Sequence, residues 1–207
     1  AQFGTAGGED DAAPDPGEPA APALNLSRTA QPIAPRLRIG MIDTGVVDHP
    51  ALLGVRLTAR DFGTGQRATD HGTAVASVLA GDGVRQIVAA NVFRGQGERQ
   101  YTSPDAIVRA LAWLVQEDVA VINISLAGPR NIALDRLISR AQAEGHLVVA
   151  AAGNGGPTAA PAYPAALPEV VAVTAVDARG RVYRHANQGS YVRFAAWGVA
   201  VPVAAPG

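Results

Sequence analysis

Short continuous apolar runs alternate along the chain with stretches in which apolar residues recur every three or four positions. A continuous apolar run is typical of a strand buried on both faces of a parallel sheet, and the wider spacing is typical of an amphipathic helix. The pattern predicts strands over residues 37–42, 87–93, 119–124, 147–152 and 170–176. Because strands and helices alternate, it predicts an α/β fold with a mainly parallel sheet covered by helices on both faces.

Three helices are predicted between these strands, and two of them carry clear start signals. The first covers residues 73–79. Ser103 followed by Pro104 is a typical start for the second helix, and Asn131 can cap the third. Gly145 is placed to end that third helix, because glycine readily adopts the left-handed conformation found after helix ends.

Residues 1–35 differ in composition from the rest of the chain. They are rich in Ala, Pro, Gly, Asp and Glu and contain almost no periodic apolar residues. Such a segment cannot bury enough apolar surface to offset the entropy lost on folding. The sequence therefore predicts a flexible N-terminal lead or linker over 1–35 and one globular domain over 36–207.

Three polar residues lie where predicted elements begin or end. Asp43 follows the first strand, His71 opens the first helix, and Asn154 follows the fourth strand between glycines. Each residue taken alone is most simply a cap or a turn residue. Open α/β sheets, however, keep their sites at the carboxyl ends of the strands, so the three together favour a shared site.

The motifs around these residues resemble those of the subtilases, the subtilisin-like serine proteases. They read Asp-Thr-Gly from residue 43, His-Gly-Thr from residue 71 and Gly-Asn from residue 153, and the resemblance runs from residue 37 onward. It implies a subtilisin-like three-layer fold and peptide bond hydrolysis by an Asp-His-Ser triad. By resemblance, Asp43 is the acid, His71 is the general base, and Asn154 donates to the oxyanion.

The same resemblance implies a groove for an extended polypeptide substrate. One side would pair with the substrate backbone by strand addition. The other would form a wall of the pocket that holds the substrate residue before the scissile bond. The residues of the two sides are Ser125, Leu126, Ala127 and Gly128, and Ala151, Ala152 and Gly153. A plain strand-to-helix loop that ends in Gly-Pro explains the first side equally well.

The Gly-Thr-Ser motif that carries the nucleophile in subtilases is absent from these 207 residues. We therefore expect the domain to lack its C-terminal part, with the serine supplied by a downstream segment or a second chain. The alternative is a catalytically inactive subtilase-like module that binds peptides and keeps Asp43 and His71 as relics. An unrelated nucleotide-binding domain is disfavoured, because the chain has no phosphate-binding loop.

Composition excludes several kinds of partner and chemistry. A net charge of −1 gives no field that would attract nucleic acid, and the absence of Cys excludes disulfides and thiol chemistry. No apolar run approaches the roughly 20 residues of a membrane helix, and no spacing of ligands suggests a metal or another cofactor. The chain begins with Ala, so we expect a removed leader, and the usual export of subtilases predicts a secreted or periplasmic protein.

Overall fold

The structure is a computed structural model, and it describes residues 4–5, 37–63, 70–95 and 100–204. The predicted flexible lead over 1–35 lies outside these ranges, except for the strand β1 (Gly4–Thr5). The division of the chain at residue 36 therefore stays a prediction.

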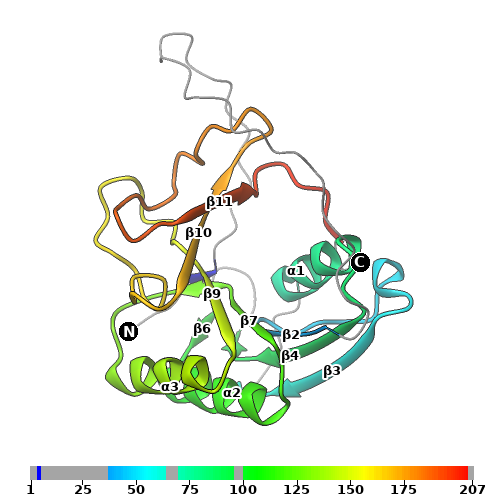
Figure 1. The fold of residues 1–207 in the computed structure, drawn as a ribbon. Helices are drawn as coiled ribbons and strands as arrows, with labels where there is room; N and C mark the ends of the chain where they lie inside the picture. Colours follow the sequence, from blue (N-terminus) through cyan, green and yellow to red (C-terminus); the bar gives the residue numbers. More distant parts are fainter. Residues whose placement is uncertain (1–3, 6–36, 64–69, 96–99, 205–207) are drawn as a thin grey trace.

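A seven-stranded sheet forms the middle layer, and every pair of neighbouring strands in it is parallel (Figure 1). The strand order is β11-β10-β9-β7-β2-β4-β3. The strands are β2 (Arg38–Asp43), β3 (Arg56–Asp61), β4 (Gln86–Asn91), β7 (Val121–Ile124), β9 (Leu147–Ala151), β10 (Val171–Val176) and β11 (Phe194–Trp197). The predicted mainly parallel sheet is confirmed.

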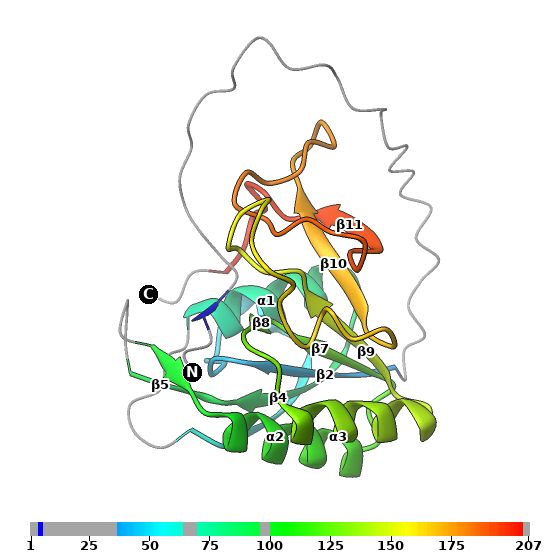
Figure 2. The same ribbon diagram turned by 90° about the vertical axis from the view of Figure 1, so that its left-hand side faces the viewer.

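Helices cover both faces of this sheet, so the predicted three-layer fold is confirmed as well. Helix α1 (Asp70–Gly81) lies on one face, and α2 (Pro104–Gln116) and α3 (Ile132–Ala143) lie on the other (Figure 2). Successive side chains of a strand point to opposite faces. Accordingly, Met41 packs in the cluster on the α1 side, whereas its neighbour Ile42 packs in the cluster with α2 and α3.

The helix ends follow the predicted capping signals closely. The Ser103 hydroxyl accepts a hydrogen bond from the Ala106 backbone N–H at 3.2 Å, and Asn131 Oδ1 accepts one from the Leu134 N–H at 3.0 Å. Gly145 follows α3 with a φ of 98°, the left-handed conformation expected of it. Helix α1 differs from the prediction, since it begins at Asp70 and therefore contains His71 in its first turn.

The strand predicted over 87–93 is divided in the structure. β4 ends at Asn91, whose side-chain oxygen accepts the Phe93 backbone N–H at 3.1 Å and so turns the chain out of the sheet. β5 (Phe93–Arg94) then pairs antiparallel with β6 (Tyr101–Thr102). The edge strands β3 and β11 were not predicted. Four of the six residues of β3 are polar and interrupt the apolar pattern, and β11 is an apolar run of only four residues.

Candidate active site

Asp43 is the last residue of β2, a central strand that has β4 on one side and β7 on the other. Its side chain has no exposed surface. The Thr44 backbone N–H donates a 2.6 Å hydrogen bond to Asp43 Oδ1, which helps to stabilise a buried carboxylate. The sequence-predicted acid therefore lies at the carboxyl edge of the sheet, as expected.

His71 lies in the first turn of α1, with Nδ1 at 2.7 Å from Asp43 Oδ1. An ionised carboxylate can only accept hydrogen bonds, so the proton between the two groups belongs to Nδ1. The other ring nitrogen, Nε2, then carries the lone pair that a general base needs. About a fifth of the His71 side chain is exposed (21%), whereas the Asp43 side chain has no exposed surface.

Three further residues of the motifs, Thr44, Gly72 and Thr73, hold the start of α1 against the end of β2. The Gly72 N–H donates to the Thr44 hydroxyl at 2.7 Å, and the Val47 N–H donates to the Thr73 hydroxyl at 3.1 Å. A Cβ at Gly72 would lie 2.3 Å from the Thr44 carbonyl oxygen, so only glycine allows this approach. Sequence reasoning had assigned no role to these residues, although their place in the Asp-Thr-Gly and His-Gly-Thr motifs was a signal.

Asn154 lies in the turn that follows β9, and its side chain is exposed. Only β7 separates β9 from β2 in the sheet, so Asn154 and Asp43 come from strand ends at the same edge. Within the described part of the chain, no hydrogen bond holds the Asn154 side chain itself. Its amide is thus able to donate to a ligand.

Ser125, the first of the predicted groove residues, lies beside the end of β2. The Ser125 N–H donates to the Ile42 carbonyl at 3.2 Å, and Ser125 Oγ accepts from Asn123 Nδ2 at 2.7 Å. After Ser125 comes the short strand β8 (Leu126–Ala127), which pairs antiparallel with β1 (Figure 2). This edge of the chain therefore accepts an extended strand.

Side chains at two of the predicted groove positions are buried. Leu126 has no exposed surface and belongs to the core, and Ala152 is only 2% exposed. These two residues can contact a bound peptide only through their main chain. Gly128 forms an antiparallel bridge with Tyr163, in which each N–H donates to the other's carbonyl at 2.9 Å. Ala151 remains partly exposed, and Gly153 adopts a φ of 108° that favours glycine.

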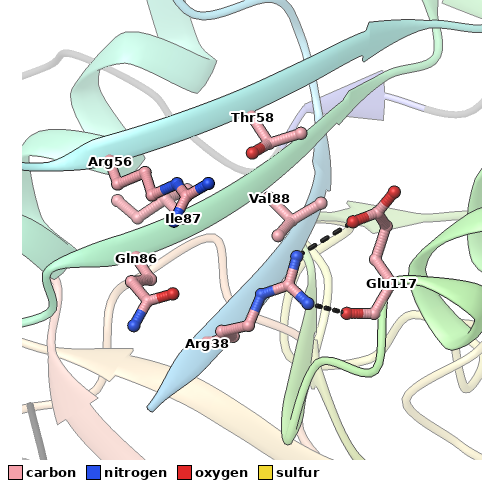
Figure 3. A pocket seen from close by; sticks show the side chains of 7 residues that line it. All are labelled: Arg38, Arg56, Thr58, Gln86, Ile87, Val88 and Glu117. Atoms are coloured by element: carbon pink, nitrogen blue, oxygen red, sulfur yellow. Dashed lines mark hydrogen bonds and ion pairs between the residues drawn. The ribbon is translucent and has the colours of Figure 1, made fainter. Parts of the chain in front are cut away.

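A polar pocket of about 330 Å³ lies at the opposite edge of the sheet, at the amino ends of β2, β3 and β4 (Figure 3). The Arg38 guanidinium, which lines it, binds the Glu117 carboxylate at 2.9 Å and also the Glu117 carbonyl oxygen. Because that ion pair is internal and distant from Asp43, this pocket has no part in the candidate site. No group of three or more potential metal ligands occurs among the residues that the structure describes.

Comparison with known proteins assigns the chain to a family. The model of the subtilase family matches residues 36–207. Subtilisin DY from Bacillus licheniformis is 33% identical over 183 residues, which are 80% of this chain and 65% of that protein. Thermitase from Thermoactinomyces vulgaris is 33% identical over 187 residues, 82% of this chain and 62% of that protein.

Other relatives agree with this assignment. Subtilisin E from Bacillus subtilis is 30% identical over 189 residues, and the chain spans 49% of its length. Among solved structures, the prenylagaramide maturation protease PagA matches with a TM-score of 0.72 and 27% identity, over 84% of this chain and 66% of that one. The family match, the homologous sequences and the shared fold together show that this chain belongs to the subtilase family of serine proteases.

Proposed function

We propose that the chain is the acid, base and oxyanion portion of a serine endopeptidase. A downstream segment or a second chain would complete it with a nucleophile in a Gly-Thr-Ser motif. The observation that carries the proposal is the 2.7 Å contact between His71 Nδ1 and Asp43 Oδ1, made by a carboxylate with no exposed surface. A surface ion pair would not need such burial, whereas a catalytic base needs a fixed tautomer.

In this proposal His71 Nε2 takes the proton of the serine hydroxyl as the serine oxygen attacks the scissile carbonyl carbon. The protonated imidazole is stabilised by Asp43 and then gives its proton to the leaving amine. Water repeats the two steps to release the acyl group. Asn154 Nδ2 would donate to the oxyanion of each tetrahedral intermediate, a contact worth about 3 to 4 kcal/mol in subtilisin, a member of this family.

The proposed substrate is an extended polypeptide. The pairing of β8 with β1 supports binding by strand addition, since it places an extended segment along Leu126 and Ala127. Ala151 is small and partly exposed, so it leaves room for a large apolar side chain of the substrate residue that precedes the scissile bond. No helix in the described part of the chain has the length and apolarity to cross a membrane. Because subtilases are usually exported, we propose that the protein acts after secretion or in a periplasm.

A second candidate function is peptide binding without catalysis. It is favoured by the antiparallel pairing of β8 with β1, because this pairing shows that β8 can hold an extended segment without any catalytic step. In that case Asp43 and His71 would take no part in catalysis, and substituting them would leave peptide binding intact.

Hydrolysis of an unfolded polypeptide by the natural protein distinguishes the two. With the serine present, His71→Ala should lower kcat by about a millionfold, the loss seen for the corresponding change in subtilisin. His49→Ala is the matched control, because His49 Nδ1 accepts the Ala51 N–H at 3.1 Å and so caps a short 3₁₀ turn (Pro50–Leu52). Equal activity of the two variants would refute His71 as the base.

A further inference from the structure

The segment 185–191 runs beside the Asn154 turn and hydrogen-bonds to four consecutive peptide units of that turn. The Tyr191 hydroxyl donates to the Ala152 carbonyl at 3.0 Å, and the Gly156 N–H donates to the His185 carbonyl at 2.9 Å. Between these outer bonds, Asn187 makes the two inner ones. It is the contact of Asn187 that bears on catalysis.

Asn187 binds the peptide units on the two sides of Asn154. Its backbone N–H donates to the Gly153 carbonyl at 2.9 Å, and its Oδ1 accepts the Gly155 N–H at 2.6 Å. Peptide units are planar, so the orientations of these two planes determine φ and ψ of Asn154. Asn187 therefore fixes the point and the direction from which the Asn154 side chain leaves the backbone.

The Asn187 side chain is itself held rigidly. It is 3% exposed, and its Nδ2 donates to the Ala160 carbonyl at 3.2 Å. A Cβ at Gly153 would lie 3.0 Å from Asn187 Nδ2, and a Cβ at Gly155 would lie 3.2 Å from Asn187 Oδ1. Glycine on both sides of Asn154 thus lets the Asn187 amide pack directly against the turn.

We propose that Asn187 is a positioning residue that holds Asn154 for its contact with the oxyanion. The inference rests on the proposed function, because it assigns Asn187 a role through Asn154. An oxyanion donor must lie about 2.7–3.1 Å from the oxygen that it stabilises, so small errors in its placement are costly. Since no hydrogen bond among the described residues holds the Asn154 side chain, its backbone is the part that the protein can fix in advance.

A double-mutant cycle with Asn154→Ala and Asn187→Leu tests this role in the natural, serine-bearing protein. Asn187→Leu keeps the side-chain volume and removes both amide contacts. It should lower kcat by about 10- to 100-fold with KM nearly unchanged, the scale expected for a donor displaced by about 1 Å. In the Asn154→Ala background the same change should lower kcat by less than about threefold, because the residue that it positions is gone.

Gln142→Leu is the matched control, since Gln142 Nε2 also makes one amide contact with a backbone carbonyl, that of Glu169, at 2.7 Å. It should leave kcat unchanged. Losses that multiply in the Asn154→Ala, Asn187→Leu double mutant, or a rise in KM alone, would overturn the inference and leave the proposed function standing. An Asn154→Ala protein with unchanged kcat would instead overturn the proposed oxyanion role and the inference with it.

Hydrogen exchange of the natural protein gives a readout that needs no activity. The Gly155 N–H should lose protection in Asn187→Leu and keep it in Gln142→Leu, with the amides of β9 unchanged in both variants. Unchanged protection of the Gly155 N–H in Asn187→Leu would show that the Asn187 side chain does not hold the turn, and would overturn the positioning role.

Discussion

Substitution of Gly72 by alanine is the sharpest test of how α1 brings His71 to Asp43. An alanine Cβ at this position would lie 2.3 Å from the Thr44 carbonyl oxygen and 2.6 Å from the Gly45 carbonyl oxygen. Both atoms belong to the backbone, so a side-chain rotation cannot relieve the clash. The start of α1 must move away from β2 instead.

The change in the free energy of unfolding follows from two destabilising contributions and one stabilising contribution. Overpacking of this kind costs about 1–3 kcal/mol, and weakening of the 2.7 Å bond from the Gly72 N–H to the Thr44 hydroxyl costs about 1 kcal/mol more. Alanine is a better helix former than glycine by at most about 1 kcal/mol. We therefore expect Gly72→Ala to lower the free energy of unfolding by about 1–3 kcal/mol.

Gly81→Ala provides the control within the same helix. A Cβ at Gly81 meets no atom within 4 Å, so only the helix propensity changes, and this variant should gain up to about 1 kcal/mol. Urea unfolding of the natural protein, followed by circular dichroism, measures both. If Gly72→Ala were as stable as Gly81→Ala, the close approach of α1 to β2 would not exist and the placement of His71 would lose its explanation.

Three further predictions concern the acid, a turn and a helix cap. Asp43→Asn should lower kcat of the serine-bearing protein by about 10⁴-fold, the loss that the same change causes in another Asp-His-Ser protease. KM should change little, and steady-state kinetics measures both constants. Hydrogen bonds from the Arg181 backbone, aided by its side chain, lower the pKa of Asp177 below its ordinary 3.8, so the carboxylate stabilises the fold above that pH and ceases to do so as the pH falls through the lowered pKa. Asp177→Asn should thus unfold more easily than wild type at neutral pH, and the difference should close in acid; a constant difference in thermal midpoint from pH 7 to pH 2 would contradict this. Ser103→Ala should cost about 1 kcal/mol in urea unfolding through the lost bond from the Ala106 N–H, and an unchanged midpoint would show that the cap is dispensable.

The central strands could be predicted from the sequence because each is an apolar run, although only β2 and β4 are buried on both faces and β7, β9 and β10 have partly exposed residues between buried ones. β2, β4, β7, β9 and β10 all appear as apolar runs, and sheet order then brings Asp43 and Asn154 to one edge. β3 could not be found in this way. It is an edge strand of sequence Arg-Leu-Thr-Ala-Arg-Asp, and four of its six residues are polar. Its backbone pairing with β4, and not an apolar pattern, makes it a strand.

In the site too, some features follow from local sequence motifs and others depend on contacts that only the fold creates. Motifs were enough to predict the contact of Asp43 with His71. The role of Thr44 as acceptor for the Gly72 N–H is a tertiary contact, and no periodicity or capping rule points to it. Asn187 carried no signal of its own, since Asn-Gln-Gly is typical of an ordinary turn, and only the fold brings it beside Asn154.

Labelling the natural protein with a serine-directed phosphonate, followed by mass spectrometry of its peptides, tests the central proposal most directly. We predict a single label on a serine in a Gly-Thr-Ser sequence outside these 207 residues, lost in His71→Ala and retained in His49→Ala. An unlabelled natural protein whose intact mass is 21.1 kDa, or a label that persists in His71→Ala, would contradict the assignment of Asp43 and His71 to a working triad.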